Sequence, residues 1–211
     1  MSDTIRIDKD AVMWSAPERE TANRPLLVLM HGYGSHEGDL FALAQYLPLE
    51  PVIASLRAPI DMGSGWAWFP PSGHSDANVR LSEIDESTAA LLEFFDSLSA
   101  TRIGLLGFSQ GGAMSLELLR AAPERFSYAA QLSGFAVPHD KPGDDVLKTL
   151  RPPVFWGRGS NEDVIPDSLI DHTIEWLPEH STLTERIYEG MAHSVIEEEI
   201  QEVSSFIKQH L

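Results

Sequence analysis

The segment Gly107–Gly111, with the sequence GFSQG, places a serine between two glycines in a G-x-S-x-G pattern. An apolar run precedes the segment and an amphipathic run follows it, which predicts a sharp strand-to-helix turn. Glycines remove the Cβ atoms that would collide at such a turn, so the hydroxyl of Ser109 would project above a sheet. We therefore predict that Ser109 is the nucleophile of an acyl-transfer reaction. The alternative is a glycine-rich turn in which this serine only caps the helix.

A serine hydroxyl is a poor nucleophile until a neighbouring base accepts its proton. Among eight histidines, only His193 lies between the last predicted strand and the last predicted helix. The chain order serine, acid, histidine requires the base at that place, so His193 is the predicted base rather than an exposed loop histidine. The acid should follow the strand Pro153–Gly157, where Glu162 and Asp163 are adjacent. Either carboxylate could orient the imidazole, and the residues alone do not separate them.

Stabilising the negative charge of the reaction intermediate requires two backbone N–H groups aimed at one point. One should come from Gln110, directly after the serine, and the other from the loop after an early strand. That loop contains Gly32, Tyr33 and Gly34, and its glycines permit a backbone that turns the N–H of Tyr33 inward. The neighbouring His31 is expected to be structural, beneath the loop. The alternative is a glycine turn that only leads into the next helix.

These groups must be held by elements that alternate along the chain. Short apolar runs predict strands, and most are apolar at consecutive positions, as in a sheet buried on both faces. The predicted strands are Leu26–Met30, Val52–Leu56, Ile103–Phe108, Tyr128–Ser133, Pro153–Gly157 and Leu183–Tyr188. Helices are predicted over Leu81–Leu98, Gln110–Ala122 and Ile196–Ile207. The alternation implies a mostly parallel central sheet with helices on both faces and chemistry in the loops beyond the carboxyl ends of the strands.

Length and composition restrict the class of protein. With 211 residues, 43% of them hydrophobic, and no repeat or linker, the chain is expected to form a single domain, residues 1–211. A net charge of −17 makes nucleic acid and anionic membranes improbable partners. We interpret the acidity as an aid to solubility, although steering of cationic substrates is an alternative. The glutamates at 197–199 are interpreted as a solvated helix start.

Cysteine content and the terminal segment bear on location. The chain has no cysteine, and its first residues, MSDTIRIDKDAVMW, lack a basic start followed by an apolar run. Both features favour the cytoplasm. The longest apolar stretches are far too short to span a bilayer, so stable membrane insertion is not expected. The sequence leaves a homodimer open.

Taken together, these motifs resemble those of the phospholipase/carboxylesterase family, which includes acyl-protein thioesterases and small bacterial carboxylesterases. The resemblance covers about Leu26 to Phe206. Its landmarks are HGYG at 31–34, LRAP at 56–59, GFSQGG at 107–112, VIP at 164–166 and GMAHSV at 190–195. It implies an α/β-hydrolase fold without a large lid domain, and esterase activity without a metal or an organic cofactor.

The resemblance also bears on the acid. In this family an aspartate commonly stands four residues before the proline of the VIP-like segment, and here that position is Glu162. Spacing favours Glu162 and residue type favours Asp163. Because glutamate serves this role in some hydrolases of the fold, we prefer Glu162.

The family further implies that the loop after LRAP lines the acyl site. In this chain we expect substrate contacts from Met62, Trp66 and Trp68, with Phe135 as a further wall. Trp68 is also a candidate for a hydrophobic anchor that holds the loop down. The predicted activity is hydrolysis of short- to medium-chain carboxylic esters, which are small-molecule substrates, through an acyl-enzyme. The alternatives are acyl-protein thioesterase or lysophospholipase activity, or a non-catalytic binding protein of the same fold.

Overall fold

A computed structural model describes residues 5–70 and 77–211. Its centre is a seven-stranded sheet with the order β1-β3-β2-β6-β7-β8-β9, in which only β1 runs antiparallel to its neighbour. The strands are β1 (Met13–Trp14), β2 (Leu26–Met30), β3 (Val52–Leu56), β6 (Ile103–Phe108), β7 (Phe126–Leu132), β8 (Pro153–Gly159) and β9 (Thr182–Tyr188). The six strands predicted from apolar runs are confirmed, each to within two residues at either end.

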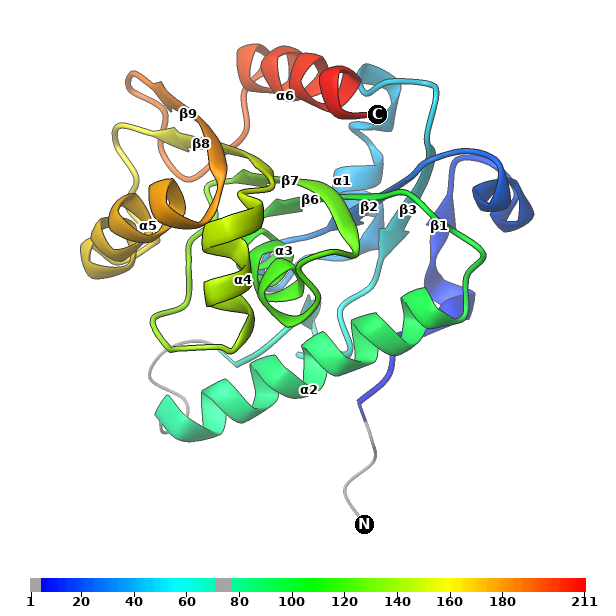
Figure 1. The fold of residues 1–211 in the computed structure, drawn as a ribbon, viewed down its shortest axis with the longest axis horizontal. Coiled ribbons are helices and arrows are strands. Elements are labelled where there is room, and N and C mark those ends of the chain that lie inside the picture. The colour runs from blue at the N-terminus through cyan, green and yellow to red at the C-terminus, as the bar shows by residue number, and fades with distance from the viewer. Residues whose placement is uncertain (1–4, 71–76) are drawn as a thin grey trace.

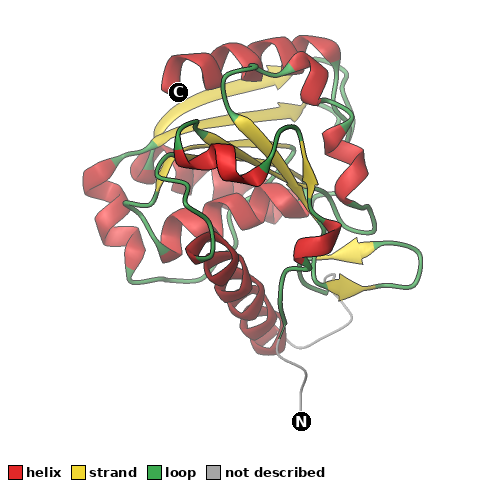
Figure 2. Cartoon of the chain, turned by 90° about the vertical axis from the view of Figure 1, so that its right-hand side faces the viewer, coloured by secondary structure: helices red, strands yellow, loops and turns green. Residues whose placement is uncertain are grey.

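Helices cover both faces of this sheet (Figure 1). They are α1 (Glu37–Phe41), α2 (Ala77–Asp96), α3 (Gln110–Ala121), α4 (Gly143–Leu150), α5 (Asp167–His180) and α6 (Glu197–His210). Three short 3-10 helices are η1 (Lys9–Ala11), η2 (Glu18–Ala22) and η3 (Ala44–Tyr46). Apolar residues of α2 to α5 join the core on one face, and those of α1 and α6 join the core on the other. Figure 2 shows the two layers from the side, with the sheet between them.

Strand β2 illustrates why consecutive apolar residues predict this arrangement. All five of its residues are buried. Leu26 and Val28 belong to the core beneath α2 and α3, whereas Leu27 and Leu29 belong to the core beneath α6. Side chains of a strand alternate between the two faces, so burial on both faces requires an apolar residue at every position.

Besides helices α1 and α4, which were not predicted, three features differ from the sequence-based expectations. The two-residue edge strand β1 was not predicted, because so short a segment has no readable period. The loop after LRAP contains an antiparallel hairpin, β4 (Ile60–Asp61) with β5 (Trp66–Ala67); residues 71–76 of the same loop lie outside the described residues. Glu199 is fully buried, so the interpretation of 197–199 as a solvated helix start is wrong for its last member.

No helix in the described part of the chain is both long and apolar enough to cross a membrane. That the whole chain forms one domain, and that it resides in the cytoplasm, stay predictions.

Candidate active site

Ser109 occupies the turn between β6 and α3, with φ 53° and ψ −116°. A non-glycine residue in this left-handed region is strained, and such strain concentrates at functional sites. The flanking glycines explain how the chain turns there. A Cβ atom at Gly107 would lie 2.1 Å from the carbonyl oxygen of Gly111, and one at Gly111 would lie 1.9 Å from that of Met30. The motif therefore lets two backbone segments approach closely beneath the serine.

The glycine-rich loop after β2 lies beside this turn. A Cβ atom at Gly32 would lie 3.0 Å from Cδ1 of Phe108, closer than most real contacts, and 3.5 Å from Cβ of Ser109, so the loop packs directly against the turn. Gly34 has φ 74°, a conformation that favours glycine. Within residues 5–70 and 77–211, the backbone N–H groups of Tyr33 and Gln110 have no backbone acceptor. Gln110 is the first residue of α3, where N–H groups have no partner within the helix. Their shared role as oxyanion donors stays a prediction.

His31 holds the glycine-rich loop from below. Its side chain is fully buried, with Nδ1 2.7 Å from the carbonyl oxygen of Gly32 and Nε2 accepting the N–H of Ala58 at 3.1 Å. These partners require a neutral ring with its proton on Nδ1. Burial accordingly lowers the pKa of His31, although the bond to Gly32 opposes the shift. Its geometry is that of a structural residue.

The loops after β8 and β9 bring His193 and Glu162 together. Nδ1 of His193 lies 2.8 Å from Oε2 of Glu162, and both side chains are largely buried. The adjacent Asp163 is exposed. Of the two candidate acids, the structure therefore places only Glu162 against the imidazole.

The other carboxylate oxygen of Glu162 accepts two backbone N–H groups, from Val164 at 2.9 Å and Ile165 at 3.1 Å. Burial alone would raise the pKa of Glu162, but the hydrogen bonds from His193 and from these two amides lower it below its usual value. The carboxylate is thus held ionised and fixed in position. These two amides were not predicted from the sequence, although an acidic side chain that accepts N–H groups two and three residues later is a common local turn.

The acid and base loops are also bonded to each other. The N–H of Asn161 donates to the carbonyl of Met191 at 3.0 Å, and the N–H of Gly190 donates to Oγ of Ser160 at 2.9 Å. A Cβ atom at Gly159 would lie 1.8 Å from the carbonyl oxygen of Met191. Tight contact between the two loops therefore accompanies the pairing of β8 with β9.

The imidazole lies close to the turn that carries Ser109. The ring of His193 packs against that of Phe108, the neighbour of Ser109, with 4.9 Å between ring centroids. Among the described residues, no hydrogen bond joins Ser109 to His193, so that contact stays a prediction. In the absence of substrate such bonds are often long and shorten in the reacting complex.

The four residues predicted to contact the substrate differ in how much of their surface is exposed. Trp68 has no exposed surface, and its Nε1 donates to the carbonyl of His31 at 2.9 Å. The expectation that Trp68 lines the substrate is therefore wrong, and it acts as an anchor. Met62 is 38% exposed, Trp66 is half-buried beneath the guanidinium of Arg57, and Phe135 is 8% exposed. Substrate contact by Met62, Trp66 and Phe135 stays a prediction.

Elsewhere, the acidic and histidine side chains of Asp85, Glu117 and His139 offer ligand atoms within 4.8 Å of one another. The ammonium of Lys141 already lies between them, 2.8 Å from Asp85 and 2.6 Å from Glu117. A cation of the protein therefore neutralises this cluster, and we assign no metal to it.

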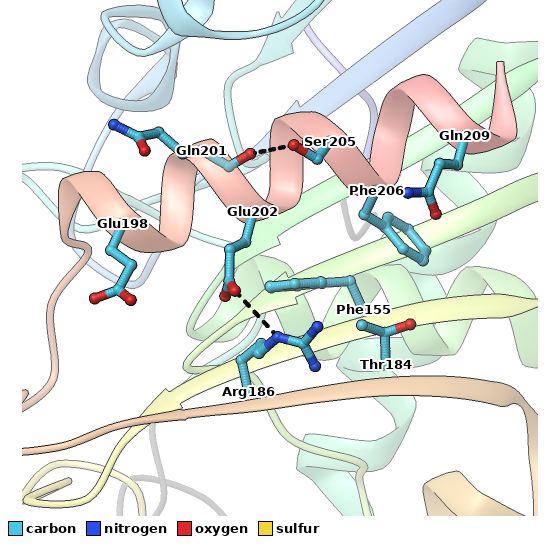
Figure 3. Close-up of a pocket in the computed structure, with 9 residues that line it drawn as sticks. All are labelled: Phe155, Thr184, Arg186, Glu198, Gln201, Glu202, Ser205, Phe206 and Gln209. Atoms are coloured by element: carbon cyan, nitrogen blue, oxygen red, sulfur yellow. Dashed lines mark hydrogen bonds and ion pairs between the residues drawn. The ribbon is translucent and has the colours of Figure 1, made fainter.

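A separate hollow of about 500 Å³ lies between α6 and strands β8 and β9 (Figure 3). Its lining residues are Phe155, Thr184, Arg186, Glu198, Gln201, Glu202, Ser205, Phe206 and Gln209. An ion pair between Arg186 and Glu202, 3.2 Å long, crosses it. None of the predicted site residues lines this hollow, so it is distinct from the candidate active site.

Comparison with known proteins agrees with this geometry. Residues 15–211 match the phospholipase/carboxylesterase family. The chain is 29% identical to acyl-protein thioesterase 1 of Kluyveromyces lactis, over 88% of this chain and 92% of that protein. Its fold is similar to that of esterase PE8 (TM-score 0.77, 24% identity, 98% of this chain and 100% of that chain). It is also similar to that of the Bacillus cereus carboxylesterase (TM-score 0.77, 17% identity, 95% of this chain and 94% of that chain). The chain has an α/β-hydrolase fold, is an ester hydrolase and belongs to the phospholipase/carboxylesterase family.

Proposed function

We propose that the protein is a serine carboxylesterase that hydrolyses short- to medium-chain carboxylic esters through an acyl-enzyme. The observation that carries this proposal is the hydrogen bond between His193 and Glu162, held beside the strained turn of Ser109. A base oriented by an ionised acid, next to a serine at a strand-to-helix turn, is the arrangement that activates a hydroxyl for acyl transfer.

In the proposed reaction, Oγ of Ser109 attacks the ester carbonyl carbon while Nε2 of His193 accepts the hydroxyl proton. The N–H groups of Tyr33 and Gln110 stabilise the resulting oxyanion. The intermediate collapses, the bond to the alcohol oxygen breaks, and His193 donates its proton to the leaving alcohol. Water then attacks the acyl-enzyme with His193 again as base, which releases the carboxylic acid and restores Ser109.

A second candidate is thioester hydrolysis, favoured by the likeness to an acyl-protein thioesterase over most of both chains. The same groups serve both reactions, because only the leaving atom differs. Lysophospholipase activity would use them as well and would differ in the pocket. Comparing kcat/KM for matched oxygen esters and thioesters of one acyl chain separates ester from thioester preference.

The decisive test of the proposal is Ser109→Ala. This variant is expected to remain folded, to lose ester hydrolysis by a factor on the order of a million, and to resist labelling by a fluorophosphonate probe. A folded variant with substantial turnover would exclude Ser109 as the nucleophile. A native protein that neither reacts with the probe nor hydrolyses any ester would instead favour a binding protein.

A further inference from the structure

The two predicted oxyanion donors lie on different segments, and a third segment connects them. Trp66 forms an antiparallel bridge with the loop that carries Tyr33. The N–H of Gly34 donates to the carbonyl of Trp66 at 2.9 Å, and the N–H of Trp66 donates to the carbonyl of Ser35 at 2.9 Å. One end of the segment Trp66–Phe69 is therefore fixed to the residues that follow Tyr33.

The other end of this segment is fixed by the side chain of Gln110. Its Oε1 accepts the N–H of Trp68 at 2.8 Å, and its Nε2 donates to the carbonyl of Phe69 at 2.6 Å. Gln110 is only 4% exposed, so both bonds form away from water. The amide orientation follows from its partners, because a backbone N–H only donates and a carbonyl only accepts.

The connecting segment is itself immobilised. The indole of Trp68 donates to the carbonyl of His31, and Oγ of Ser87 on α2 donates to the carbonyl of Trp68. Phe69 is buried in the core. A displacement at one end of such a segment is transmitted to the other end rather than absorbed within it.

We propose that the carboxamide of Gln110 is a positioning group for the oxyanion hole. By fixing the segment Trp66–Phe69, it sets the position of the Tyr33 N–H relative to the N–H of Gln110 itself, so that both converge on one oxygen. The side chain touches neither substrate nor reacting atoms; it acts through the backbone of Trp68 and Phe69. This inference rests on the proposed function and adds a role for Gln110 beyond its own N–H.

The test uses Gln110→Met, which preserves the length of the side chain and removes both hydrogen bonds. Because a small misplacement of an oxyanion donor weakens binding of the transition state, kcat/KM is expected to fall about 10- to 100-fold. The loss should lie mainly in kcat, with KM changed by less than about threefold. Affinity for a trifluoromethyl ketone, which forms an oxyanionic adduct with Ser109, should fall in parallel with kcat/KM.

Gln131→Met is the matched control. Gln131 is fully buried on β7, and neither atom of its amide has a hydrogen-bond partner among the described residues. The same chemical change there should leave kcat and ketone affinity close to those of the native enzyme. Equal losses in the two variants would show that packing around the Ser109 turn matters in general, and would overturn the specific role of Gln110.

Gln110→Glu keeps the inference testable if the methionine variant fails to fold. The carboxyl that it introduces can accept the N–H of Trp68 in either form, but it can donate to the carbonyl of Phe69 only when protonated. The ratio of the kcat of Gln110→Glu to that of the native enzyme should therefore rise as the pH falls from about 9 to about 6. Taking this ratio removes the pH dependence that the variant shares with the native enzyme.

Two further outcomes would overturn the inference while the serine mechanism stands. One is a folded Gln110→Met variant with kcat within about threefold of native, even if its thermal midpoint is lower. The other is a flat pH ratio for a folded Gln110→Glu variant. Failure of the proposed function looks different: Ser109→Ala would then retain activity, whatever the Gln110 variants do.

Discussion

Nδ1 of His193 lies 2.8 Å from a carboxylate oxygen of Glu162, while Asp163, the next residue along the chain, faces solvent. The pairing depends on a local turn in which Glu162 also accepts the N–H groups of Val164 and Ile165. That turn directs one carboxylate inward and leaves its neighbour outside.

We therefore expect Glu162→Gln to be far more damaging than Asp163→Asn. The amide can present the wrong group to Nδ1 and cannot stabilise the imidazolium, so kcat should fall about 100- to 10,000-fold. The kcat of Asp163→Asn should stay within about threefold of the native value, because an exposed carboxylate interacts only weakly with its surroundings. Steady-state kinetics of the two purified variants provide the measurement. The reverse order would make Asp163 the functional acid.

The anchor role of Trp68 predicts a change in stability without a change in specificity. Trp68→Phe removes the hydrogen bond to the carbonyl of His31 and should lower the free energy of unfolding by about 1–3 kcal/mol. The dependence of KM on acyl length should not change, since the side chain is fully buried. Met62→Ala is the comparison, because Met62 is exposed and should alter that dependence instead. An altered acyl preference in Trp68→Phe alone would restore Trp68 to the substrate wall.

Glu199 makes stability depend on pH. Burial raises the pKa of Glu199 to about 8, and the nearby charge of Glu202 adds to the shift. A carboxyl whose pKa is raised on folding binds its proton more tightly in the native state than in the unfolded state. The stability that Glu199 contributes is therefore fully present below pH 4.5, its ordinary pKa, and is lost as the pH rises toward about 8. Glu199→Gln should remove this loss, worth up to about 1.4 kcal/mol per unit of pKa shift.

The measurement is the thermal midpoint of unfolding from acid to mildly alkaline pH. The native protein should lose stability across this window, and Glu199→Gln should lose less. Glu198→Gln is the matched control, because Glu198 lies in the same helical turn but is exposed. If both variants keep the native pH dependence, the titrating group lies elsewhere.

Acyl length should affect the rate only up to a limit. The described part of the loop after LRAP contains a short hairpin, which we expect to line the acyl site, and Met62 on it is exposed. Each methylene covered by such a surface should add up to about 0.8 kcal/mol of binding, and each methylene beyond it little. We expect kcat/KM to rise and then flatten or fall along a series from acetyl to palmitoyl esters. A steady increase through the longest chains would favour a lysophospholipase or thioesterase pocket.

The sequence predicts best those features that depend on the periodicity of apolar residues and on the order of residues along the chain. Runs of consecutive apolar residues, such as Leu26–Met30, predict strands buried on both faces. Chain order selects His193 among eight histidines as the predicted base, and the structure places it against Glu162. Pattern does not separate Glu162 from Asp163, because the two share one sequence environment and differ only in the turn that follows. Nor does it reveal that Glu199 is buried, because its carboxylate fits against β8 only where Gly157 has no side chain.

The direct bonds between the acid loop and the base loop bear on how the acid could change without displacing the base. Asn161 is bonded to Met191 and Gly190 to Ser160, so contacts between the two loops position the carboxylate and the imidazole, in addition to the packing of His193 on Phe108. A side chain that is one carbon longer than aspartate can be accommodated within these loops, by adjustment of the turn at 162–165, without displacing the nucleophile. The length of the acidic side chain can therefore change while the contacts that join the two loops stay in place.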